Sequence, residues 1–93
     1  MSTTIIKVAH LTSVHSRFDT RIFFKECDSL ASHGYLVALI VADGKGYEQK
    51  NGIQVYDVGL SNSRFDRIKN TPGRVLNKAL ELDADIYHLH DPE

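Results

Sequence analysis

Two short stretches of the chain hold most of the side chains that could do chemistry. One is TSVHSRFDTR (residues 12–21), and the other is YHLHDPE (residues 87–93). The first stretch offers His15, Arg17 and Arg21, whose N–H groups suit phosphate or sugar oxygens, beside the start of an expected helix, where anions are stabilised. It contains no glycine, so it lacks the close backbone approach of a G-x-G-x-x-G pyrophosphate cradle. We therefore expect a polar, oxygen-rich ligand here, but not a self-sufficient dinucleotide or ATP site.

Part of this loop has an equally good structural interpretation. Arg17 and Asp19 could form a pair that orders the loop, and Phe18 could pack beneath the helix. The sequence leaves both interpretations open for Asp19 and Phe18, whereas it favours a functional role for His15 and Arg17.

The second stretch places His88 and His90 two positions apart on a strand-like run, so both imidazoles point to the same face. His10 lies on another strand-like run, expected to be its neighbour. Three histidines with Asp91 could bind a metal ion. Buried strand histidines held by hydrogen bonds are commoner, so the prediction is that no metal is bound.

These side chains must be positioned by a sheet and two helices. Apolar runs predict four strands, at Ile5–Leu11, Tyr35–Ala42, Ile53–Val58 and Asp85–His90. Apolar positions with helical spacing predict one helix from residue 20, ending at the glycine of His33-Gly34. Ser63 and Asp66 have capping-box spacing for a second helix. Pro72-Gly73 either kinks that helix or starts a second segment.

Strands that alternate with helices indicate a mostly parallel sheet. The prediction is a single domain over residues 1–93, a partial Rossmann-like, three-layer α/β fold with four strands in the order 3-2-1-4. Residues 42–52, between the second and third strands, are expected to form a loop, which leaves the direction of the third strand open. Ligands of such sheets bind beyond the carboxyl ends of the strands, where the strand order reverses. That point lies between the first and fourth strands, so the two stretches should meet there.

Composition narrows the class of protein. Eleven basic and twelve acidic residues give a formal charge of −1, which argues against a nucleic-acid-binding module. The single Cys27 excludes an internal disulfide and fits a reducing compartment; its place on the apolar helix face favours a core position. The chain has no signal-peptide pattern and no apolar run near the ~20 residues of a membrane helix. We expect a cytoplasmic protein, and peripheral attachment to a membrane stays open.

Two segments carry a resemblance to a known family. HLTSVHSRFDTRIFFKECDSLASHGYLVALIVADGKG and ALELDADIYHLHDPE resemble the N-terminal part of bacterial glycosyltransferases of family 4. The similarity covers nearly the whole chain, is specific at both ends and is loose between Tyr47 and Val75. It departs from the family pattern at NTPG, where that pattern would continue as an uninterrupted helix.

The resemblance implies an enzyme of GT-B architecture, in which two Rossmann-like domains face each other across a cleft. The N-terminal domain would shape the acceptor site, while the C-terminal domain would hold the nucleotide-sugar and an E-x7-E-type motif. The residues that would bind substrate are Ser13, His15, Arg17, Asp19, His90 and Asp91. No catalytic residue is assigned within the 93 residues, and the family needs no divalent metal and no resident cofactor.

From this resemblance we expect hexosyl transfer from a nucleotide-sugar donor to a sugar acceptor, in polysaccharide biosynthesis. We also expect the chain to be a truncated portion that is inactive alone, with its fourth strand exposed for pairing in a homodimer. Two alternatives remain open. One is a non-enzymatic module that binds a sugar phosphate or a protein, and the other is a small metal-binding α/β protein built on His10, His88 and His90.

Overall fold

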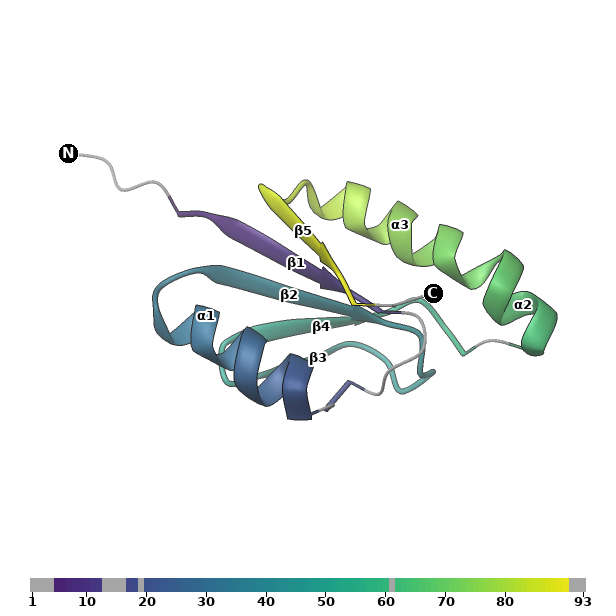
Figure 1. Cartoon of the computed structure of the whole chain (residues 1–93), viewed down its shortest axis with the longest axis horizontal. Helices are drawn as coiled ribbons and strands as arrows, with labels where there is room; N and C mark the ends of the chain where they lie inside the picture. Colours follow the sequence, from purple (N-terminus) through teal and green to yellow (C-terminus); the bar gives the residue numbers. More distant parts are fainter. Residues whose placement is uncertain (1–4, 13–16, 19, 61, 91–93) are drawn as a thin grey trace.

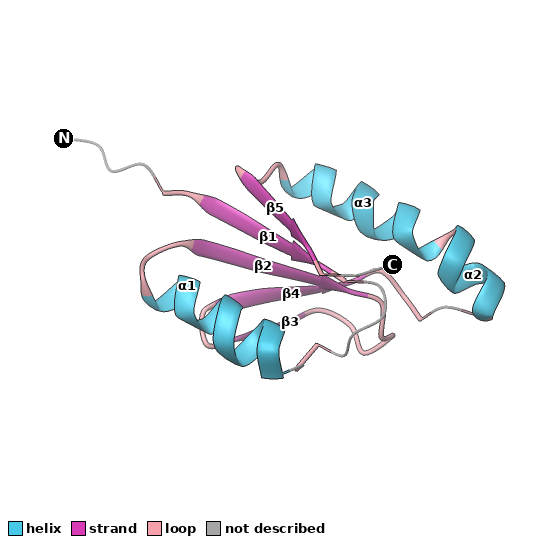
Figure 2. Ribbon diagram, viewed as in Figure 1, coloured by secondary structure: helices cyan, strands magenta, loops and turns pink. Residues whose placement is uncertain are grey.

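The computed structural model describes residues 5–12, 17–18, 20–60 and 62–90. It confirms an α/β fold, in which one mixed sheet has helices on both faces (Figures 1 and 2). Four of the predicted substrate-binding residues lie outside the described residues, namely Ser13, His15, Asp19 and Asp91.

Within the described residues the sheet has five strands rather than the four predicted. They are β1 (Lys7–Leu11), β2 (Leu36–Val41), β3 (Glu48–Lys50), β4 (Ile53–Asp57) and β5 (Ile86–Leu89). Their order is β3-β4-β2-β1-β5. The four predicted strands, now β4, β2, β1 and β5, lie in the predicted order 3-2-1-4, and the correction is the additional strand β3 beside β4. The pairs β1–β2, β1–β5 and β2–β4 are parallel, so the direction of β4 is now fixed.

The missed strand is β3, which pairs antiparallel with β4 at the edge of the sheet. Asn51 and Gly52 join the two strands, and both have positive φ angles of 54° and 77°. This is the backbone that a two-residue hairpin requires, and Asn-Gly is its strongest sequence signal. The prediction of a loop over residues 42–52 was therefore wrong for Glu48–Lys50, which form β3.

The first helical region begins as a π-helical segment, η1 (Thr20–Cys27), and continues as α1 (Asp28–Ser32). As predicted, it ends before Gly34, whose φ of 93° suits a residue without a side chain. α2 (Arg64–Lys69) and α3 (Thr71–Leu82) lie on the opposite face of the sheet (Figure 1). Within the described residues, no helix has the length and apolar character needed to cross a membrane.

The start of α2 confirms the predicted cap. The Ser63 hydroxyl accepts a hydrogen bond of 3.1 Å from the Asp66 backbone N–H. A break at Asn70 separates α2 from α3, whose first turn contains Pro72. The two alternatives for Pro72-Gly73 are thereby resolved in favour of a second helical segment, with Asn70 at its N-cap position.

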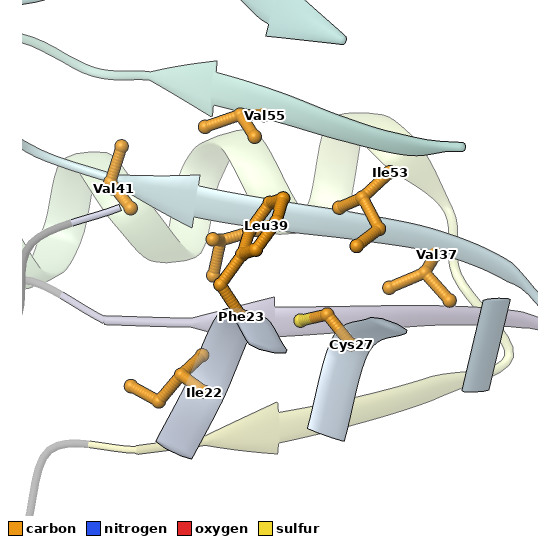
Figure 3. Packing of buried hydrophobic residues seen from close by; sticks show 8 residues of the cluster. All are labelled: Ile22, Phe23, Cys27, Val37, Leu39, Val41, Ile53 and Val55. Carbon is orange, nitrogen blue, oxygen red and sulfur yellow. The ribbon is translucent and has the colours of Figure 1, made fainter. Parts of the chain in front are cut away.

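Each face of the sheet has its own apolar core. Between the sheet and η1, the core contains Ile22, Phe23, Cys27, Val37, Leu39, Val41, Ile53 and Val55 (Figure 3). On the other face, Val75 and Ala79 of α3 pack on Ala9 and Leu11 of β1. Cys27 is fully buried, so its predicted core position is confirmed. Since side chains alternate along a strand, His10 of β1 lies on the η1 face.

Candidate functional site at the carboxyl edge of β1 and β5

The site begins with the parallel pairing of β1 and β5, where the strand order reverses along the sheet. In this pairing His10 of β1 lies directly opposite His88 of β5. The chain after β5 stays attached to β1, because the His90 N–H donates to the Leu11 carbonyl at 2.9 Å. His10, His88 and His90 therefore occupy neighbouring positions on one face, near the carboxyl ends of both strands, as predicted.

These three residues form what we call the histidine cluster. The ring centroids of His88 and His90 are 4.1 Å apart, and those of His10 and His90 are 4.9 Å apart. His10 Nδ1 and His90 Nε2 are joined by a hydrogen bond of 2.7 Å. His10 and His90 are buried, whereas the His88 side chain is 51% exposed. The cluster thus reaches from the interior to the surface.

A fourth polar group, Glu26 of η1, completes the site from the helical layer. Its Oε1 lies 3.5 Å from His88 Nδ1, and its side chain is 33% exposed. One potential ligand atom from each of His10, Glu26, His88 and His90 lies within 4.8 Å of the others. Sequence reasoning missed Glu26, because the distance between a helix and a sheet has no signal in a single sequence.

The surroundings of His10 keep its imidazole neutral. Burial, followed by the proximity of His90 and His88, lowers the pKa of His10 to about 4. His10 is therefore uncharged at neutral pH. Within the part of the chain that the structure describes, its buried Nε2 has no hydrogen-bond partner. A neutral imidazole such as that of His10 can bind a cation through its lone pair, or donate and accept hydrogen bonds with a hydroxyl-rich ligand.

The predicted site residue Arg17 takes part in a different network. Its guanidinium makes two hydrogen bonds of 2.7 Å to the Asp43 carboxylate and one of 2.9 Å to Glu48. A fourth bond, also 2.7 Å, reaches the Gly46 carbonyl. Arg17 is only 3% exposed. These bonds tie the segment after β1 to the loop after β2, which favours an ordering role over direct contact with a ligand.

The charges of this network stabilise each other. The hydrogen bonds that Arg17 donates to the Asp43 carboxylate raise the pKa of Arg17 further above its ordinary range. Burial alone would raise the pKa of Asp43, but its bonds from Arg17 and from the Lys45 N–H outweigh burial and lower it. Both groups are therefore ionised at neutral pH.

The glycine-containing loop between β2 and β3 is also engaged internally. The N–H groups of Gly44 and Gly46 donate to the Asp57 carboxylate at 3.1 and 2.9 Å, and that of Gly59 donates at 2.8 Å. Burial opposes ionisation of Asp57, but these bonds prevail and lower its pKa. The amide groups that a phosphate would need are thus occupied by a carboxylate of the chain itself.

The two described residues of the predicted site therefore belong to separate networks, Arg17 with the loop after β2 and His90 with the histidine cluster. Comparisons of the chain with models of known protein families, with curated proteins and with solved structures gave no match. What bears on function is then the geometry described above, together with the resemblance carried by the two motifs.

Proposed function

We propose that this chain is the acceptor-side α/β unit of a nucleotide-sugar-dependent glycosyltransferase of GT-B architecture. In this proposal the sheet is part of a Rossmann-like domain, and the ligand lies beyond the carboxyl ends of β1 and β5. The observation that supports it best is the position of His90. This residue is buried at the edge where the strand order reverses, and it belongs to the YHLHDPE motif that carries the resemblance.

The described side chains would divide the work between binding and positioning. The imidazoles of the histidine cluster can exchange hydrogen bonds with sugar hydroxyls. Arg17 would fix the segment after β1 through its bonds to Asp43 and Glu48. Ser13, His15, Asp19 and Asp91 remain predicted substrate contacts, on the segments that flank these two anchors.

Catalysis would require groups from a second domain. By the resemblance, that domain holds the nucleotide-sugar and supplies the E-x7-E-type acids. The acceptor hydroxyl would attack the anomeric carbon, and the nucleoside diphosphate would leave with the bonding electrons. We therefore expect the 93-residue chain to bind ligand weakly and to release no nucleotide from a nucleotide-sugar.

Calorimetric titration with UDP, GDP and their hexose conjugates, in the presence of EDTA, tests this proposal. His90→Gln should weaken saturable binding by about 2- to 10-fold, the equivalent of one net hydrogen bond. The matched control is His33→Ala, because His33 is exposed at the far end of α1 and bonds the Ser29 carbonyl. Binding that is absent in every titration, or equally weakened in both variants, would contradict the proposed site.

A further inference from the structure

We propose that His10, Glu26, His88 and His90 form a binding site for a divalent first-row metal ion, Zn²⁺ in the first place. This goes beyond the proposed function, which requires no metal. Three imidazole nitrogens and one carboxylate oxygen are a ligand set that zinc accepts with tetrahedral geometry. All four donors come from elements that the fold holds together, namely β1, β5 with the residue that follows it, and η1.

The distances are close to those that an ion would impose. Zn–N bonds of about 2.0–2.1 Å place two ligand atoms about 3.3 Å apart in a tetrahedron. The present separation of His10 Nδ1 and His90 Nε2 is 2.7 Å, that of His88 Nδ1 and Glu26 Oε1 is 3.5 Å, and no pair exceeds 4.8 Å. The first pair must open slightly, and the more distant donors must approach. The side chains that would move most freely are the two with exposed surface, His88 and Glu26.

The histidine cluster lies in a row of otherwise apolar side chains, where burial of polar groups is energetically unfavourable. The strand register places four side chains in one row across the sheet: Val55 of β4, Leu39 of β2, His10 of β1 and His88 of β5. The row is apolar over β4 and β2, where it belongs to the core beneath η1, and changes to histidine over the next two strands. Burying a polar ring without partners for its nitrogens is unfavourable. His10 is 1% exposed and its Nε2 lacks a partner among the described residues, so the hydrogen bond to His90 leaves part of this buried ring unsatisfied.

A bound ion would also hold the edge strand β5 to the helical layer. β5 is the edge strand, all four of its residues are exposed, and within the described chain it pairs only with β1. An ion held by His88 and His90 on one side and by Glu26 on the other would cross-link this strand region to η1. Binding energy gained only in the folded state then appears as thermal stability that depends on metal concentration.

The test uses tag-free protein, freed of metal with EDTA and then titrated with Zn²⁺ alone. We expect one ion per chain, a melting temperature that rises with free Zn²⁺, and shifts of the imidazole nitrogens of the histidine cluster in NMR spectra. Co²⁺ in place of Zn²⁺ should give the visible absorption of a tetrahedral site. The imidazole of His33 should not shift, since it lies outside the cluster.

Two variants that leave the interior intact, His88→Ala and Glu26→Gln, make the proposal falsifiable even if His10 variants fail to fold. Each should weaken Zn²⁺ binding by at least about tenfold, while His33→Ala should bind like the parent chain. Equal binding by all four proteins, several weak ions per chain, or no rise in melting temperature would overturn the metal site. Because nucleotide-sugar binding is measured in EDTA, loss of the metal site would leave the glycosyltransferase proposal standing, and the converse also holds.

Discussion

Replacement of Arg17 by methionine is expected to reveal whether this residue orders the fold or binds a ligand. Methionine keeps much of the apolar length of the side chain but removes the four guanidinium hydrogen bonds to described residues. Removing one partner of a buried ion pair costs about 3–5 kcal/mol. Asp43 and Glu48 are 16% and 40% exposed, so solvent relieves part of the penalty, and we expect a loss of about 2–4 kcal/mol.

A loss of that size is large for a chain of this length. A 93-residue domain has a free energy of unfolding of roughly 5–14 kcal/mol. At about 4–8 °C per kcal/mol, the melting temperature should fall by at least roughly 8 °C. Urea unfolding followed by circular dichroism measures the change directly. In a double-mutant cycle with Asp43→Asn, the two losses should be clearly less than additive, because both variants break the same pair.

The matched control removes a cation with a weaker role. Lys78 pairs with the exposed Glu81 at 3.2 Å, and its ammonium lies 5.6 Å from the Tyr56 ring centroid. Lys78→Met should cost less than about 1 kcal/mol. If Arg17→Met is no more destabilising than Lys78→Met, yet abolishes nucleotide-sugar binding, the assignment of Arg17 as an ordering residue is refuted and the direct binding role is restored.

Three further predictions concern other parts of the chain. Hydrogen bonds from Arg74, then the Asn62 N–H and Asn70, lower the pKa of Asp66 to about 2; this stabilisation is complete above about pH 4 and is lost as the pH falls through 2. Asp66→Asn should therefore lower the urea midpoint strongly at pH 7 and only slightly at pH 2. An equal decrease at both pH values would contradict the stabilising role of the ionised Asp66 carboxylate. Burial raises the pKa of Cys27 to about 12, so a thiol reagent at pH 8 should react with Cys27 only as fast as the chain unfolds. The free energy of unfolding should fall as the pH rises above about 9, because the unfolded chain then ionises the thiol more readily. Rapid modification of Cys27 in the folded chain would contradict its burial. The exposed edge of β5, with Leu89 at 66% exposure, should support a concentration-dependent homodimer that Leu89→Lys prevents, whereas sedimentation of the parent chain as a monomer at high concentration would exclude this pairing.

The parts of the fold that sequence reasoning predicted correctly have strong local signals. β2 is a continuous apolar run covered on both faces, and the Ser63 cap needs only the spacing to Asp66. β3 was missed because its three residues are polar and partly or wholly exposed, so hydrophobic periodicity cannot mark it. The Asn51-Gly52 turn was the available signal, and it was interpreted as part of a loop.

The candidate site shows the same contrast between local and long-range information. The shared face of His88 and His90 follows from strand alternation, and the position of His10 beside them follows from the order of parallel strands. The partners of Arg17 could not be predicted, because Asp43 and Glu48 are 26 and 31 positions away and are brought together only by the loop after β2. Glu26 was missed for a further reason. It lies on π-helical backbone, whose turn is wider than the 3.6-residue period used to assign helix faces.

A proton–nitrogen NMR titration of the chain with nucleotide-sugars in EDTA would locate the ligand-binding site on the sheet. We expect saturable shifts concentrated at the carboxyl ends of β1 and β5, including Thr12 and His90, with none near His33, which lies just before the start of β2. A dispersed spectrum of a folded chain that does not change at saturating ligand, or shifts centred away from this edge, would contradict the claim that it is the binding site.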